Sequence, residues 1–127
     1  ESLLSNGIRV SVYARYQAAY SRPTEEQYVF SYHIVIENCR EDTVQLLYRH
    51  WVITNGMGEV QEIEGDGVIG LQPILEPGDV HSYDSWCTLA SPLGSMEGRY
   101  LMVSTETGEE FYAQVPRFQL ESTVVMN

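Results

Sequence analysis

Lysine is absent from this chain, and its seven cationic residues are all arginines. Against them stand 18 acidic residues, which give a formal net charge of -11 at pH 7. Binding to a phosphate backbone depends on Lys and Arg side chains that displace counterions, and anionic membrane surfaces attract the same side chains. We therefore expect neither nucleic acid nor a membrane as a partner.

Long apolar runs are missing as well, and none approaches the roughly 18 residues that a membrane-spanning helix requires. The first seven residues contain no basic segment followed by an apolar one, so we expect no secretory signal. Cys39 and Cys87 are the only cysteines and lack the spacing of a disulfide framework. A reduced, cytoplasmic protein fits these absences best.

Helical periodicity is also absent, because apolar residues nowhere recur at i, i+3, i+4 and i+7 over three turns. Apolar and polar residues alternate instead, with the period of two that is typical of half-buried strands. This pattern predicts strands over residues 8–17, 28–37, 44–54, 59–64, 79–89, 99–105 and 110–115. Gly and Pro between residues 65 and 78 predict an extended loop or short edge strands. The sequence therefore predicts one all-β domain over residues 1–127, an antiparallel two-sheet β-sandwich of seven to eight strands.

Several separated segments of the chain carry a family resemblance. They are RYQ at 15–17, VQLLYRHW at 44–51, the glycine loop at 65–70, GSMEGRY at 94–100 and VPRF at 115–118. Together they resemble the ApaG domain family, over a core from about Gly7 to Leu120. The resemblance implies a sandwich of the immunoglobulin or fibronectin type III kind. The chain departs from the family's pattern at Asp84 and Trp86, where the family favours small or hydroxyl residues. It also departs from the pattern in lacking Lys. These departures put any binding surface over residues 84–87 in doubt.

The resemblance also bears on function. The family includes stand-alone bacterial proteins and domains attached to F-box proteins and to a polymerase-associated eukaryotic protein, which implies protein interaction. A genetic association with cobalt and magnesium tolerance belongs to the family's description, whereas no family-wide catalytic reaction does. The resemblance therefore implies a role in binding.

Gly65, Gly67 and Gly70 follow the spacing G-x-G-x-x-G, which binds pyrophosphate where a strand precedes it and a helix follows. Pro73 and Pro77 preclude that helix, and acidic residues around the loop repel phosphate. We expect these glycines to serve turns and close sheet packing. The alternative is a small-ligand binder in which the loop and the acidic residues bind a divalent cation, with or without pyrophosphate.

The sequence contains no complete metal-binding or catalytic motif. The histidines at 33, 50 and 81 and the two cysteines form no short-spaced pair such as HxH or CxxC, so we predict no dedicated metal site and no cofactor. Residues 94–98 superficially resemble a nucleophile elbow, but the serine is second rather than third, and we expect a loop with glycines at tight bends. We predict no catalytic residue and no enzymatic activity.

One strand face has the composition of an interaction surface. Tyr13, Arg15 and Gln17 lie opposite the apolar face of the first predicted strand. Exposed Tyr beside Arg is typical of binding hot spots. We expect Trp51 in the core, whereas Trp86, next to Asp84, is expected at the surface. The leading hypothesis is a non-enzymatic interaction module whose partner is another protein.

Overall fold

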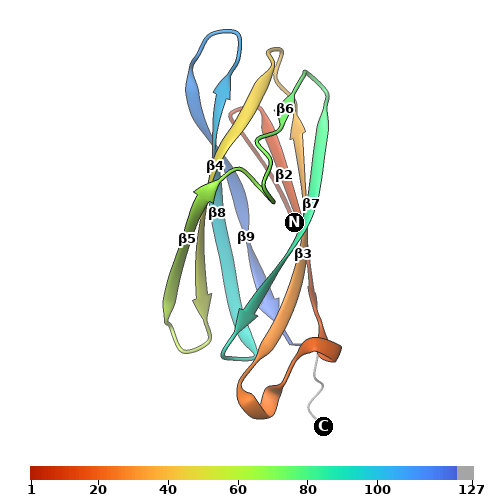
Figure 1. The fold of residues 1–127 in the computed structure, drawn as a ribbon, viewed down its shortest axis with the longest axis vertical. Coiled ribbons are helices and arrows are strands. Elements are labelled where there is room, and N and C mark those ends of the chain that lie inside the picture. The colour runs from red at the N-terminus through yellow and green to blue at the C-terminus, as the bar shows by residue number, and fades with distance from the viewer. Residues whose placement is uncertain (123–127) are drawn as a thin grey trace.

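The computed structural model describes residues 1–122, which fold into two packed antiparallel sheets (Figure 1). The four-stranded sheet has the order β1 (Ser2–Ser5), β2 (Ile8–Tyr16), β3 (Tyr28–Asn38), β7 (Val80–Leu89). The five-stranded sheet has the order β5 (Val60–Asp66), β4 (Val44–Asn55), β8 (Leu93–Ser104), β9 (Glu110–Glu121), with β6 (Ile74–Leu75) paired to β4. Two short 3-10 turns, Ala18–Tyr20 and Pro23–Glu25, connect β2 to β3. The predicted two-sheet β-sandwich is confirmed.

Alternation along the strands places one apolar face of each sheet in the core. Ile8 and Val10 of β2 and Ile34 of β3 are fully buried in the four-stranded sheet, as the period of two predicts. An aromatic cluster around Trp51 fills the centre of the sandwich; its ring lies 5.6–6.3 Å from the rings of Tyr32, Tyr100 and Phe118. Trp51 is 3% exposed, which confirms its expected place in the core.

The two long sides of the sandwich differ. On one side, β9 packs against β1 and β2 and closes the space between the sheets. On the other side, a cleft opens between β7, the edge of one sheet, and β5, the edge of the other. The connection from β5 to β6 crosses between the two layers, as Figure 1 shows, and it buries Val68 against the core. The fold therefore leaves one side open for a ligand.

Strand β8 corrects the expectation of a loop at residues 94–98. This segment pairs with β4 and β9 along its length. Its glycines allow close packing rather than tight bends: a Cβ at Gly94 would lie 2.6 Å from the Thr54 carbonyl oxygen, and one at Gly98 would lie 2.8 Å from the Trp51 ring. Gly94 and Gly98 therefore allow β8 to approach β4 closely inside the sheet.

Strand β9 extends beyond the predicted end at Val115, through Pro116, to Glu121. A proline cannot donate to the ladder, but the β8–β9 register shifts between Met96 and Gly98, and Pro116 falls at this bulge. The short strand β1 adds to the predicted set, since a run of four residues carries too little alternation to be recognised. Strand β6 lies in the stretch 65–78, for which an extended loop or short edge strands were predicted.

No helix in the described part of the chain is long and apolar enough to cross a membrane.

Candidate functional site

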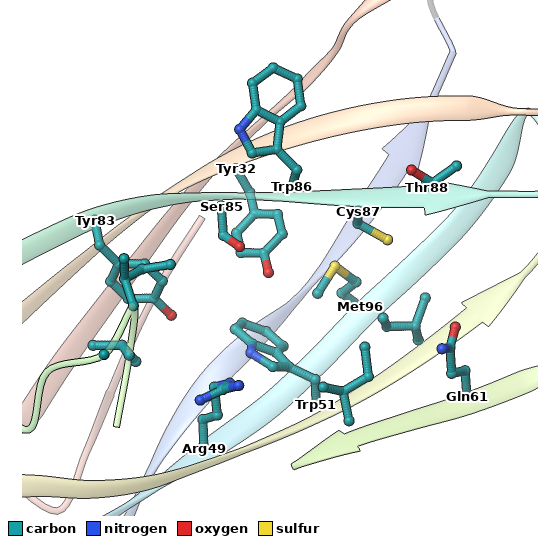
Figure 2. A pocket seen from close by; sticks show the side chains of 15 residues that line it. Tyr32, Arg49, Trp51, Gln61, Tyr83, Ser85, Trp86, Cys87, Thr88 and Met96 are labelled. Carbon is teal, nitrogen blue, oxygen red and sulfur yellow. The ribbon is translucent and has the colours of Figure 1, made fainter. Parts of the chain in front are cut away.

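The open side of the sandwich forms a cleft of about 400 Å³. Side chains of both sheets and of the β5–β6 connection line it, and Figure 2 shows Tyr32, Ser85 and Tyr83 facing Arg49 and Trp51 across the space. The volume lies within the roughly 300–1,000 Å³ that small-ligand sites occupy. The cleft is therefore large enough for a small organic molecule.

A β-bulge in β4 directs Arg49 into this cleft. Val44 and Leu46 are buried, and the register with β8 then shifts between Leu46 and Tyr48, so that one residue is added to the strand. A bulge reverses the alternation that follows it. After the shift, Arg49 and Trp51 face inward, whereas strict alternation from Val44 would have turned both outward.

Arg49 is held in place through its contact with the glycine loop. Its Nη1 donates to the backbone carbonyls of Asp66 at 2.9 Å and Gly67 at 3.1 Å. Gly65 lies opposite Arg49 in the ladder, and a Cβ there would lie 2.8 Å from Nη2. Within residues 1–122, Arg49 forms no ion pair with a carboxylate. The guanidinium is thus fixed in position but not neutralised.

The glycine loop is organised by its own backbone. The amide of Gly67 donates to the Leu47 carbonyl, and the amide of Val68 donates to the Leu71 carbonyl. Gly67 has φ 59, and a Cβ there would overlap the Leu71 carbonyl, so only glycine fits. Gly70 also has a positive φ, in open space. The β5–β6 connection contains no helix to direct further amides at an anion. Ligand binding by Gly65, Gly67 and Gly70 stays a prediction.

Burial raises the pKa values of three groups that line the cleft, Cys87, Tyr32 and Tyr83. Desolvation raises the pKa of Cys87 to about 11, so the group remains a thiol. It also raises the pKa of Tyr32, against the opposing effect of the Ser85 hydroxyl, and raises the pKa of Tyr83. The hydroxyls of Tyr83 and Tyr100 are hydrogen-bonded to each other at 2.5 Å. The cleft therefore presents neutral hydroxyls and a guanidinium, which can donate hydrogen bonds to a polar or anionic ligand.

Two of the three histidines pair with carboxylates, and His81 lies instead against the Tyr83 ring. His33 Nδ1 lies 2.9 Å from Asp84 Oδ1, and His50 Nε2 lies 2.8 Å from Glu62 Oε1. Among the described residues, no group of three or more His, Cys, Asp or Glu side chains could hold a metal ion. Binding of a divalent cation near the loop stays a prediction.

The predicted interaction surface lies on the outer face of the four-stranded sheet, away from the cleft. Tyr13 is 61% exposed, and Arg15 is exposed without a hydrogen bond or ion pair inside the described chain. Gln17 lies just beyond β2, where its Nε2 donates to Ser31 Oγ at 2.7 Å. Its part in an interaction stays a prediction.

The register of the sheet adds two aromatic residues to this surface. Arg15 pairs with Ser31, and Ser31 pairs with Trp86, so Trp86 lies two strands away from Arg15 on the same face. Trp86 is 53% exposed, as expected, and points away from the cleft in Figure 2. Its ring meets that of Tyr20 edge to face at 5.4 Å. We call Tyr13, Arg15, Tyr20 and Trp86 the outer-face patch.

Sequence patterns alone missed two features of these sites. Arg49 was visible only as a member of the segment VQLLYRHW at 44–51, because its inward direction depends on the bulge. The contact between Tyr20 and Trp86 joins residues 66 positions apart, although Trp86 itself stood out beside Asp84 as an exposed aromatic. The doubled leucine at Leu46-Leu47 was the available signal for the bulge.

Comparison with known proteins gives consistent matches across the chain. The model of the ApaG domain matches residues 18–104. The chain is 46% identical to Protein ApaG of Thiobacillus denitrificans over 120 residues, 94% of each chain. It is also 46% identical to Protein ApaG of Rhodospirillum centenum over 121 residues, covering 95% of this chain and 92% of that one. A crystal structure of an ApaA protein from Bordetella pertussis superposes with a TM-score of 0.89 at 40% identity, covering 93% of this chain and 95% of that one.

Proposed function

The chain belongs to the ApaG domain family, and from that premise we propose that it is a non-enzymatic protein-interaction module that uses the outer-face patch. The observation that carries this proposal is the exposed Trp86–Tyr20 pair on the same sheet face as Arg15, which lies two strands from Trp86. Trp, Tyr and Arg are the residues most enriched at interface positions that dominate binding energy.

Two side chains of the outer-face patch are partly ordered before any partner binds. The ring centroids of Trp86 and Tyr20 lie 5.4 Å apart, so each ring restricts the motion of the other. Binding a partner therefore costs less side-chain entropy, because the two rings are already partly ordered in the free protein. Arg15 retains all its donors, since no described residue accepts from them. A partner with an acidic or polar group beside an apolar one would complement this arrangement.

The opposite outer face supplies the contrast. Tyr112 of β9 is 42% exposed, but Arg99 already stacks on its ring, with the guanidinium carbon 4.2 Å from the ring centroid. Its cation is therefore engaged within the chain. The outer-face patch differs because its arginine is free.

We further propose that the protein acts in the cytoplasm. Cys39 and Cys87 are both free thiols, and structural disulfides are rare in reducing compartments. We also propose that any influence on cobalt and magnesium tolerance acts through the protein partner, since the proposed surface consists of aromatic and arginine side chains.

Affinity capture from the host lysate, quantified by mass spectrometry, tests the proposed surface. Trp86→Ala and Arg15→Ala should each weaken retention of the partner by roughly tenfold or more, in keeping with hot-spot truncations of about 2 kcal/mol. Because both residues are exposed, the melting temperature of each variant should remain near that of the unmodified chain.

The matched control is Tyr112→Ala, which removes an exposed aromatic beside an arginine on the other outer face. It should leave retention unchanged. Equal losses for Tyr112→Ala and Trp86→Ala, or the absence of any specifically retained protein, would contradict the proposal.

A further inference from the structure

The cleft on the open side of the sandwich has an unusual charge for this chain. The protein carries a net charge of -11, yet Arg49 is the only charged residue among the described residues that line the cleft. The acidic residues of β5 that flank it, Glu62 and Glu64, alternate with the lining residues Gln61 and Ile63 and so face the other side of the strand. The cleft therefore combines an acidic exterior with a cationic interior.

Arg49 has binding capacity left over. Its Nη1 is occupied by two loop carbonyls, whereas Nε and Nη2 make no hydrogen bond within residues 1–122. No carboxylate neutralises it. A half-buried guanidinium without a counterion favours an anion, and its planar fork matches the geometry of a carboxylate.

Polar and apolar side chains share the rest of the cleft lining. Its exposed aliphatic residues are Ile63 of β5 and Ile69 of the connection, whereas Trp51, Ile53, Met96 and Val68 border it from the core and are almost fully buried. Ile69 has φ 47 and remains 61% exposed, although a β-branched residue rarely adopts the left-handed region. An apolar side chain is thus held at the cleft against its backbone preference.

We propose that this cleft binds a small-molecule monocarboxylate with an apolar body, its carboxylate on Arg49 and its body against Ile63 and Ile69. A single guanidinium complements a single negative charge, and the two exposed isoleucines complement an alkyl chain or a ring. The neutral hydroxyls of Tyr32 and Ser85 face Arg49 in Figure 2 and interact with each other, so that one O–H group of the pair remains as a donor beside the carboxylate.

Polyphosphate fits this cleft less well than a monocarboxylate does. The amides of Gly67 and Val68 already donate to carbonyls, and Arg49, the only charged residue among the described lining residues, would leave most of the charge of a polyphosphate uncompensated. The inferred ligand differs from the one predicted for the glycine loop, and the site differs from the outer-face patch, which it adjoins at Trp86.

The test is an NMR titration of the ¹⁵N-labelled chain with three probes: octanoate, 1-octanol and inorganic pyrophosphate. Octanoate should shift the indole N–H signal of Trp51 and the Nε–H signal of Arg49 saturably, with a Kd of about 1 mM or tighter. Octanol, which has the chain without the charge, should bind at least about tenfold more weakly, because a charged hydrogen bond is lost. Equal binding of octanol, tighter binding of pyrophosphate, or octanoate shifts confined to other surfaces would overturn the proposal.

Variants of the lining residues separate the charge from the wall. Arg49→Gln should weaken octanoate about tenfold and affect octanol much less, since octanol makes no charged contact with the guanidinium. Ile69→Asn should weaken both probes, because Asn tolerates the left-handed region but provides no apolar wall. If Arg49→Gln binds octanoate like the unmodified chain, the proposed anchor is wrong.

A matched pair of surface variants keeps the test decisive even where Arg49→Gln perturbs the loop that it holds. Gln61→Trp places a large ring in the cleft from β5, whereas Gln114→Trp places the same ring on β9, outside the cleft. Both glutamines are exposed, so both variants should fold. Octanoate binding should be lost in Gln61→Trp and retained in Gln114→Trp, and the reverse result would contradict the assignment.

Discussion

Arg40 shows how one side chain can connect three distant parts of the chain. Its Nε donates to Asp42 Oδ1 at 2.7 Å, its Nη1 donates to the Asn6 carbonyl at 3.0 Å, and its guanidinium lies 4.2 Å over the Phe111 ring. Gly7 makes room for it, because a Cβ there would overlap the Arg40 side chain. The β1–β2 turn, the β3–β4 turn and β9 thereby meet at one residue.

The Arg40–Asp42 pair predicts a specific pH dependence of stability. Hydrogen bonds from Arg40 and from Ser104 hold the pKa of Asp42 well below its ordinary value of about 3.9. A carboxyl whose pKa is lower in the folded state contributes stability that is fully present above the unfolded pKa and is lost as pH falls through the folded pKa. Asp42→Asn should therefore cost most stability above about pH 5, and its difference from the unmodified chain should shrink towards pH 2.

Urea unfolding at a series of pH values measures this difference. Arg40→Gln removes the main cause of the shift, so it should flatten the same acidic limb of the stability curve. If the Asp42→Asn curve ran parallel to that of the unmodified chain over the whole range, the pair would have no linked role.

The strands show both the reach and the limits of prediction from sequence. The alternation in residues 28–37 identified β3 because each inward position there is apolar, and the same pattern located β2 and most of β4. Alternation fails where a register shift changes its phase. The direction of Arg49 could not be predicted for this reason, since the bulge before Tyr48 is fixed by pairing with β8.

Glycine in a strand was the second obstacle. Gly98 suggested a tight bend, yet it lies inside β8, where the Trp51 ring and the His50 carbonyl take the space of a side chain. Which reading holds depends on what lies across the sheet, and neighbouring residues in sequence carry no information about that. The cleft was beyond reach for the same reason: its walls come from β3, β4, β5, β7, β8 and the β5–β6 connection.

Gly98→Ala tests this packing role directly. The added Cβ would overlap the His50 carbonyl and press on Trp51, so the free energy of unfolding should fall by roughly 1–3 kcal/mol, as in other overpacked cores. Gly56→Ala is the control, because a Cβ there meets its nearest atom at 3.2 Å, and its effect should stay below about 1 kcal/mol. Equal stability of the two variants in urea unfolding would show that Gly98 is not needed for the approach of β4 to β8.

The two candidate surfaces of the molecule face different directions and adjoin along one strand. The outer-face patch lies on the solvent side of the four-stranded sheet, whereas the cleft lies between the edges β5 and β7. They meet at β7, where Ser85 faces the cleft and Trp86 faces solvent, as alternation requires (Figure 2). A ligand in the cleft would therefore lie against β7, the strand that also carries Trp86.

The acidic charge of the molecule shapes how a partner would approach. A net charge of -11 favours association with a basic surface and makes the on-rate sensitive to ionic strength. The free Arg15 is a local exception on this surface, and the central claim is that the patch around it contacts the protein partner.

Photo-crosslinking tests that claim most directly. A benzophenone amino acid placed at position 86, and in a matched chain at position 112 on the opposite outer face, is activated by light in host cells, and the adducts are identified by mass spectrometry. The account predicts a discrete adduct with one partner protein from position 86 and none from position 112. Adducts of equal yield from both positions, or an adduct from position 112 alone, would contradict it.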